Sequence, residues 1–84
     1  MYYTYVLRSK KDGNLYTGYT RNLKARFESH QNGEVESTAY RRPLELVYYE
    51  ACRLQQDAIK REKYLKTYYG KMFLKNRLKS DSTG

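Results

Sequence analysis

Two short segments rich in tyrosine and threonine, 2–9 and 15–20, lie on either side of Lys10-Lys11-Asp12-Gly13-Asn14. Aromatic and β-branched residues favour strands, and an Asp-Gly pair supplies the positive φ angle that a tight turn needs. The pattern predicts an antiparallel β-hairpin at the start of the chain. This hairpin is the strongest constraint that the sequence places on the fold.

The centre of the turn sets how the two strands pair. Side chains alternate between the two faces of a strand, so a pairing also decides which residues share a face. A turn centred on Asp12-Gly13 puts Tyr5 and Tyr16 on one face, and a β-bulge would shift the register. The opposed pairs that it predicts are Tyr5 with Thr20, Leu7 with Gly18, and Ser9 with Tyr16.

The later elements are predicted from helix caps, breakers and changes of period. Thr20 or Asn22 can cap a first helix, and Gly70 stands where the residue after a C-cap is often glycine. The order β-β-α-β-α-α predicts an α+β fold, with a three-stranded, mainly antiparallel sheet flanked by helices. The expected ranges are helix 22–32, loop 34–43, strand 44–51, helix 55–69 and helix 71–78.

The length of 84 residues fits one domain with one small core. We expect residues 1–79 to form this domain and the polar residues 80–84 to be a disordered tail. A lone cysteine, Cys52, cannot make an internal disulfide and fits a reducing compartment, so a cytoplasmic location is expected. No run approaches the ~20 apolar residues that span a bilayer, and the N-terminal apolar run is too short for a signal peptide. A secreted or membrane-spanning protein is therefore not expected.

The formal net charge of +8 points to a polyanionic partner, and nucleic acid is the leading class. The charge is concentrated near the C-terminus. From Lys60 to Lys79 there are eight Lys or Arg residues and one acid, Glu62. This segment is expected to follow a nucleic-acid backbone through contacts that are sensitive to salt.

Glu62 is the least expected residue of the predicted second long helix. At 100° per residue it falls inside the apolar stripe that contains Ala58 and Leu65, where an unpaired carboxylate costs free energy. It could form a salt bridge with a nearby arginine such as Arg26. It could also bind a hard divalent cation that keeps several waters.

The first predicted helix carries a polar pair beside an apolar one. Arg26 and His30 are four residues apart, beside the apolar pair Leu23 and Phe27. Such residues at the edge of an apolar stripe commonly bury their stems and leave their polar ends in water. That structural interpretation stands beside a catalytic one.

The eleven tyrosines also allow two interpretations. In a small core they can be half-buried packing residues with a polar tip. Alternatively, several tyrosines exposed on one basic face would form a stacking platform for unpaired bases. The packing interpretation is expected for five of them: Tyr48, Tyr49, Tyr64, Tyr68 and Tyr69.

An ordered set of motifs resembles the GIY-YIG nuclease superfamily. The set consists of Tyr3-Thr4-Tyr5, Tyr16-Thr17-Gly18 after ten intervening residues, Arg26, His30, Arg42-Pro43, strand 44–50 and the segment 57–67. The resemblance covers roughly residues 2–79 and is closest to the small stand-alone members, which are related to the catalytic domain of the excinuclease of nucleotide excision repair.

The resemblance implies roles for individual residues. Tyr16 matches the general base or proton relay, and Arg26 matches the arginine that steadies the scissile phosphate. His30 matches a position that helps with proton transfer. Glu62 matches the ligand of a single Mg²⁺ or Mn²⁺ ion. The remaining implied residues are Tyr5, which would orient the phosphate or base, and two supporting residues, Gly18 and Asn76.

The chain also departs from the family pattern. Tyr3 and Thr4 replace Gly and Ile, and Thr17 replaces Ile. Tyr19 stands where some repair members have a lysine, so a metal-bound water or His30 would have to help the Tyr16 phenol. An ordinary tyrosine with a pKa near ~10 is a poor base at neutral pH.

The function implied is that of a metal-dependent DNA endonuclease with weak sequence specificity, acting in repair or recombination. Its specificity would come from a branched or damaged DNA substrate or from a protein partner, and the domain itself would be a monomer. The alternatives are a nucleic-acid-binding module without catalysis and a protein that binds structured RNA. The expected nucleic-acid contacts are Lys24, Arg41, Arg42, Lys60, Arg61, Lys63, Lys66, Lys71 and Lys75.

Overall fold

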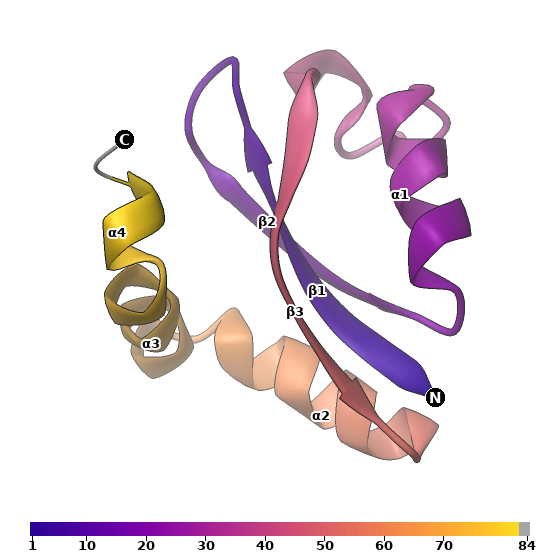
Figure 1. Cartoon of the computed structure of the whole chain (residues 1–84), viewed down its shortest axis with the longest axis vertical. Helices are drawn as coiled ribbons and strands as arrows, with labels where there is room; N and C mark the ends of the chain where they lie inside the picture. The colour runs from indigo at the N-terminus through magenta and orange to yellow at the C-terminus, as the bar shows by residue number, and fades with distance from the viewer. Residues whose placement is uncertain (83–84) are drawn as a thin grey trace.

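A computed structural model describes residues 1–82 as a three-stranded antiparallel sheet with helices on both faces (Figure 1). This confirms the α+β fold predicted from the sequence, with strand order β2-β1-β3. None of the helices within residues 1–82 has the length and apolar character needed to cross a membrane. The elements are β1 (Tyr2–Ser9), β2 (Leu15–Thr20), α1 (Leu23–Gln31), a 3-10 helix η1 (Ala39–Arg41), β3 (Leu44–Cys52), α2 (Gln55–Leu65), α3 (Tyr68–Arg77) and α4 (Lys79–Ser82).

The central strand β1 is buried on both faces. Alternate side chains of a strand point to opposite sides, so Tyr5 and Leu7 pack beneath α1 while Val6 packs against α2 and α3. Figure 1 shows α1 on one side of the sheet and α3 and α4 on the other. Two small apolar clusters result, one on each face, and β1 contributes to both.

The strand register differs from the prediction by two residues. Tyr5 lies opposite Gly18, and Leu7 lies opposite Tyr16. The connection consists of residues 10–14 and is closed by the backbone of Ser9, whose N–H donates to the Asn14 carbonyl at 2.9 Å. Because the error is an even number, Tyr5 and Tyr16 still share a face. The shift makes them diagonal neighbours there.

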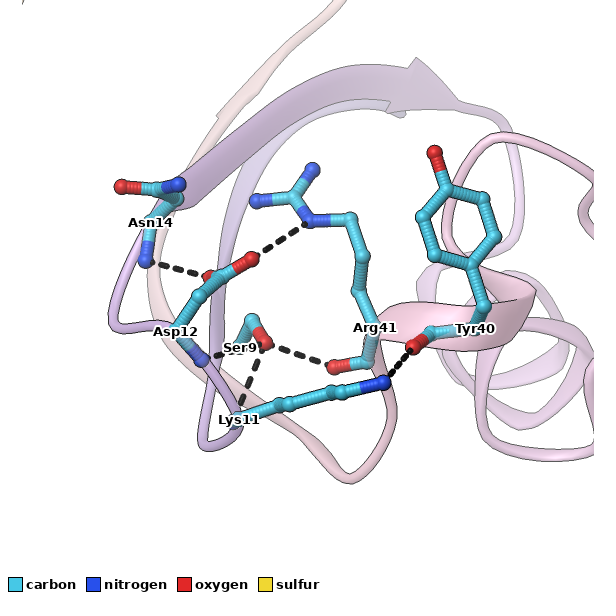
Figure 2. A network of polar contacts seen from close by, with 6 residues as sticks. All are labelled: Ser9, Lys11, Asp12, Asn14, Tyr40 and Arg41. Carbon is cyan, nitrogen blue, oxygen red and sulfur yellow. Dashed lines mark hydrogen bonds and ion pairs between the residues drawn. The ribbon is translucent and has the colours of Figure 1, made fainter.

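Side chains of the β1–β2 loop bind it to the segment that contains η1 (Figure 2). The Ser9 hydroxyl donates to the Arg41 carbonyl at 2.6 Å and accepts from the backbone N–H of Lys11 at 3.1 Å. Asp12 forms an ion pair with Arg41 at 3.6 Å, and the Lys11 ammonium donates to the Tyr40 carbonyl at 3.2 Å. These bonds explain why the loop is longer than a two-residue turn.

The boundary between α2 and α3 was predicted wrongly. The helix starting at Gln55 ends at Leu65, and Thr67 caps the next helix by accepting a hydrogen bond from the Gly70 N–H at 3.2 Å. Gly70 therefore lies in the first turn of α3 and does not end α2. It is needed for close approach, because a Cβ at this position would lie 2.0 Å from the carbonyl oxygen of Tyr64.

The C-terminal segment also differs from the prediction. The polar composition predicts a disordered tail from residue 80, but residues 80–82 form α4 together with Lys79. Asp81 in this helix forms an ion pair and a hydrogen bond with Arg8 of β1. Residues 83 and 84 lie outside the described residues.

We expect Gly70→Ala to lower the free energy of unfolding by about 2 kcal/mol or more, because overpacking against backbone atoms has no easy relief. Urea unfolding followed by circular dichroism measures this change. Asn76→Ala, an exposed position on the same helix, is the control and should leave the stability within about 0.5 kcal/mol of the parent. Equal stabilities for the two variants would contradict the close packing of the α2–α3 corner.

Candidate active site

The Tyr5 side chain occupies the space that Gly18 leaves open on the neighbouring strand. Tyr5 is 1% exposed, and a Cβ on Gly18 would lie 2.6 Å from its hydroxyl oxygen. Any larger residue at position 18 would displace the phenol. The structure thus gives a physical reason for a glycine at the third position of the second tyrosine motif.

A line of hydrogen bonds passes through the Tyr5 hydroxyl. Arg26 Nε donates to this oxygen at 3.3 Å, and His30 Nε2 lies 2.9 Å from it. On the far side of the ring, His30 Nδ1 lies 2.7 Å from Thr38 Oγ1, which donates to the Val35 carbonyl at 3.5 Å. With the Thr38 proton used in this way, His30 Nδ1–H donates to Thr38 and Nε2 accepts from Tyr5.

The pKa shifts agree with this direction. Burial, followed by the positive charge of Arg26, lowers the pKa of His30 from 6.5 to about 4, so its ring is neutral at pH 7 and can accept. Burial raises the pKa of the Tyr5 phenol; the Arg26 hydrogen bond opposes this, and Tyr16 and Glu62 add to it. The Tyr5 hydroxyl therefore keeps its proton.

His30 is fully buried, at 0% exposure. The interpretation of an edge residue with its polar end in water is therefore wrong for His30. Thr38, its partner, was not predicted from the sequence. It lies in a segment without hydrophobic period, and no motif singles it out.

Tyr16 is placed differently from Tyr5. Its ring is half-buried, with its centroid 5.1 Å from that of His30 and 6.4 Å from that of Tyr5. It lines an open cleft of about 740 Å³ between the hairpin and the α2–α3 corner. Of the two motif tyrosines, Tyr16 is the one that a molecule in this cleft would meet.

Glu62 projects from α2 with its side chain 17% exposed. Its Oε2 lies 3.0 Å from the ammonium of Lys66, one turn further along. Its ion-pair partner is therefore Lys66, whereas Arg26 was the arginine suggested from the sequence. Because Glu62 helps to raise the pKa of Tyr5, its carboxylate also acts on the tyrosine cluster.

Within residues 1–82 there is no group of three or more His, Cys, Asp or Glu residues that could enclose a metal ion. A divalent ion here would bind the single carboxylate of Glu62 and otherwise water or phosphate oxygens. Mg²⁺ is commonly held in this way, by one or two carboxylates together with substrate phosphates. The donor set therefore fits a hard ion that is completed by the substrate.

All three arginines expected at the nucleic-acid surface have structural partners. Arg61 pairs with Glu50 at 2.9 Å, and its guanidinium lies 4.8 Å from the centre of the Phe73 ring. Arg42 donates to the backbone carbonyl of Ala39 in η1 at 2.6 Å and to that of Gln31, the last residue of α1, at 3.4 Å. Arg41 pairs with Asp12, although it also lines the cleft beside Tyr16.

The lysines expected at this surface are exposed, as is Arg42, whereas Arg41 and Arg61 are half-buried. Lys66 and Lys71 line the cleft with Tyr16. Asn76 is exposed on α3 and lies outside the set of described residues that line the cleft. The exposed lysines expected to bind nucleic acid are Lys24, Lys60, Lys63, Lys66, Lys71 and Lys75.

The packing interpretation of the tyrosines holds for only part of the set. Tyr48 is half-buried and donates to Glu50 at 2.7 Å. Tyr68 and Tyr69 are 71% and 73% exposed, so the expectation of half-burial is wrong for them. They are exposed because α3 begins at Tyr68, so they do not continue the apolar stripe of α2. Tyr49 and Tyr64 are also exposed.

A family model described as the GIY-YIG catalytic domain matches residues 1–78. The chain is also similar to a UPF0213 protein of Staphylococcus epidermidis, with 41% identity over 75 residues that cover 88% of this chain and 90% of that one. A UPF0213 protein of Staphylococcus aureus is 41% identical over 68 residues, which cover 80% of this chain and 82% of the relative.

A solved structure has a similar fold. The solution NMR structure of a UPF0213 protein from Bacillus halodurans aligns with a TM-score of 0.54 and 33% sequence identity. The alignment covers 88% of this chain and 82% of that one.

We expect acid to destabilise the protein through His30. Its pKa is about 4 when folded and near 6.5 when unfolded, so the unfolded chain binds the proton more tightly. The contribution of the neutral His30 ring to the free energy of unfolding is complete above pH 6.5 and is lost as the pH falls toward 4. Between pH 7.5 and pH 5 it amounts to about 2 kcal/mol.

Urea unfolding at the two pH values measures this loss. The control is His30→Gln, which can still bond to Tyr5 and Thr38 but cannot titrate. The variant should lose about 2 kcal/mol less than the parent over this interval. Equal losses would show that His30 is not held neutral in the folded protein.

Proposed function

The chain belongs to the GIY-YIG family, which implies nuclease activity, and from this premise we propose that it is a metal-dependent DNA endonuclease. The observation that carries the proposal is the hydrogen-bonded cluster at the Tyr5 phenol. Arg26 and His30 bond to its hydroxyl, and the ring of Tyr16 lies close to those of Tyr5 and His30. A module that only binds nucleic acid does not need such a buried relay.

Arg26 is the group that would bind the scissile phosphate. Its Nε is held by Tyr5, which fixes the guanidinium and leaves the Nη groups as donors for phosphate oxygens. A fixed positive charge placed before the reaction stabilises charge that develops on the phosphate in the transition state. Tyr5 and His30 would then be positioning residues, because both are buried and act through Arg26 and Tyr16.

Tyr16 would take or relay the proton of the attacking water, since it is the motif tyrosine that lines the cleft. Glu62 would hold one Mg²⁺ or Mn²⁺. When bound there, such an ion neutralises charge on the phosphate and on the leaving oxygen.

The substrate would be bound mainly through lysines. Exposed ammonium groups contact phosphates without reading bases, so we propose weak intrinsic sequence specificity. A branched or damaged DNA structure, or a partner protein, would then select the site of cleavage in repair or recombination.

We expect the protein to nick supercoiled plasmid with Mg²⁺ or Mn²⁺ and not with EDTA. Glu62→Gln and Tyr16→Phe should each lower the rate by about 10²-fold or more, because each removes a group that acts on the reacting atoms. Conversion of supercoiled to open-circular plasmid on agarose gels measures the rate.

Glu28→Gln is the matched control, because Glu28 is an exposed carboxylate on α1. This variant should nick like the parent. Full activity of Glu62→Gln would contradict the assignment of Glu62. Plasmid binding by the parent without any nicking, under all metal conditions, would support a binding module instead.

A further inference from the structure

Lys66 forms an ion pair with Glu62, the carboxylate that the proposed reaction requires for its metal. It is the residue that follows the last turn of α2, and its ammonium lies 3.0 Å from Glu62 Oε2. The Glu62 side chain is 17% exposed, whereas that of Lys66 is 53% exposed. Glu62 is therefore fixed by its surroundings, and the long side chain of Lys66 can leave it.

A divalent cation and the Lys66 ammonium compete for the Glu62 carboxylate. At such short distances two positive charges repel strongly, even where solvent screens them in part. Metal binding at Glu62 therefore favours movement of the Lys66 ammonium away from it. The ion pair with Lys66 lowers the affinity of the free protein for metal.

The cleft beside Tyr16 offers Lys66 another place. Lys66, Lys71 and Arg41 line it, and the described residues that line it include no acid. A phosphate of a bound strand in this cleft would be an anion within reach of the Lys66 side chain. Nucleic acid in the cleft would thus attract Lys66 and release Glu62.

We propose that Lys66 couples metal loading to nucleic-acid binding: it pairs with Glu62 in the free protein and moves to a substrate phosphate when metal binds. This inference rests on the proposed function, because it takes Glu62 as the metal ligand. Coupling between two binding sites is reciprocal, so metal must also strengthen nucleic-acid binding by releasing Lys66. Lys66 is in this sense a positioning residue that weakens metal binding to Glu62 until substrate is present.

The first experiment measures Mn²⁺ binding to the protein alone by the EPR signal of free Mn²⁺. Lys66→Met and Lys66→Gln should bind Mn²⁺ about threefold to tenfold more tightly than the parent, because the competing ammonium is gone. Lys79→Met removes an equal charge from an exposed position in α4, outside the proposed nucleic-acid surface, and should change the affinity much less. Circular dichroism checks that each variant is folded.

The second experiment measures reciprocity by fluorescence anisotropy of a short labelled DNA duplex, with Tyr16→Phe as the background so that the probe stays intact. Mn²⁺ should tighten DNA binding by a larger factor when Lys66 is present than in Lys66→Met. Lys79→Met should keep the full factor.

The outcomes separate this inference from the proposed function. If Lys66→Met binds Mn²⁺ no better than Lys79→Met does, Lys66 forms only a surface ion pair, and the coupling is wrong. If Glu62→Gln binds Mn²⁺ as tightly as the parent, Glu62 is not the ligand. That second result overturns the metal assignment itself, whatever Lys66 does.

Discussion

The buried hydroxyl of Tyr5 is the interaction on which the rest of the site depends. A phenol without solvent contact needs hydrogen-bond partners, and here they come from α1 through Arg26 and His30. Gly18 provides the space for the Tyr5 ring, and Thr38 is the hydrogen-bond partner of His30 Nδ1. Four segments that are distant in sequence are thereby held in one arrangement around a single oxygen atom.

The sequence predicts much of this arrangement, because period and composition decide which residues share a face. The hairpin, the sheet and the shared face of Tyr5 and Tyr16 follow from a period of two. The register could not be predicted, because it depends on how the Ser9 hydroxyl and Asp12 bond to a segment some thirty residues away. The end of α2 was misplaced for a related reason: Gly70 allows backbones to approach closely, which looks the same in sequence as a helix-ending glycine. Thr38 could not be found because a residue that only orients another has no motif.

The structure also shows that the arginines and lysines do not contribute alike to a nucleic-acid surface. Counted along the sequence, arginine and lysine contribute alike to the surface. In the fold, Arg61, Arg42 and Arg41 are bonded to Glu50, to backbone carbonyls and to Asp12, so they stabilise the domain. The lysines remain at the surface. Lysine is a mobile point charge without the fixed fork of arginine, so this surface suits attraction of a backbone more than recognition of a base.

Thr38 lies in the connection between α1 and β3, whose described contribution to the cleft is Arg41 alone. Yet this connection orients the histidine that orients Tyr5. In the proposed mechanism, a change in this connection that removed the Thr38 hydroxyl would alter how His30 and Tyr5 are held. The same connection binds the hairpin through Ser9 and Asp12, so exchanging it between relatives would change the hairpin and the site together.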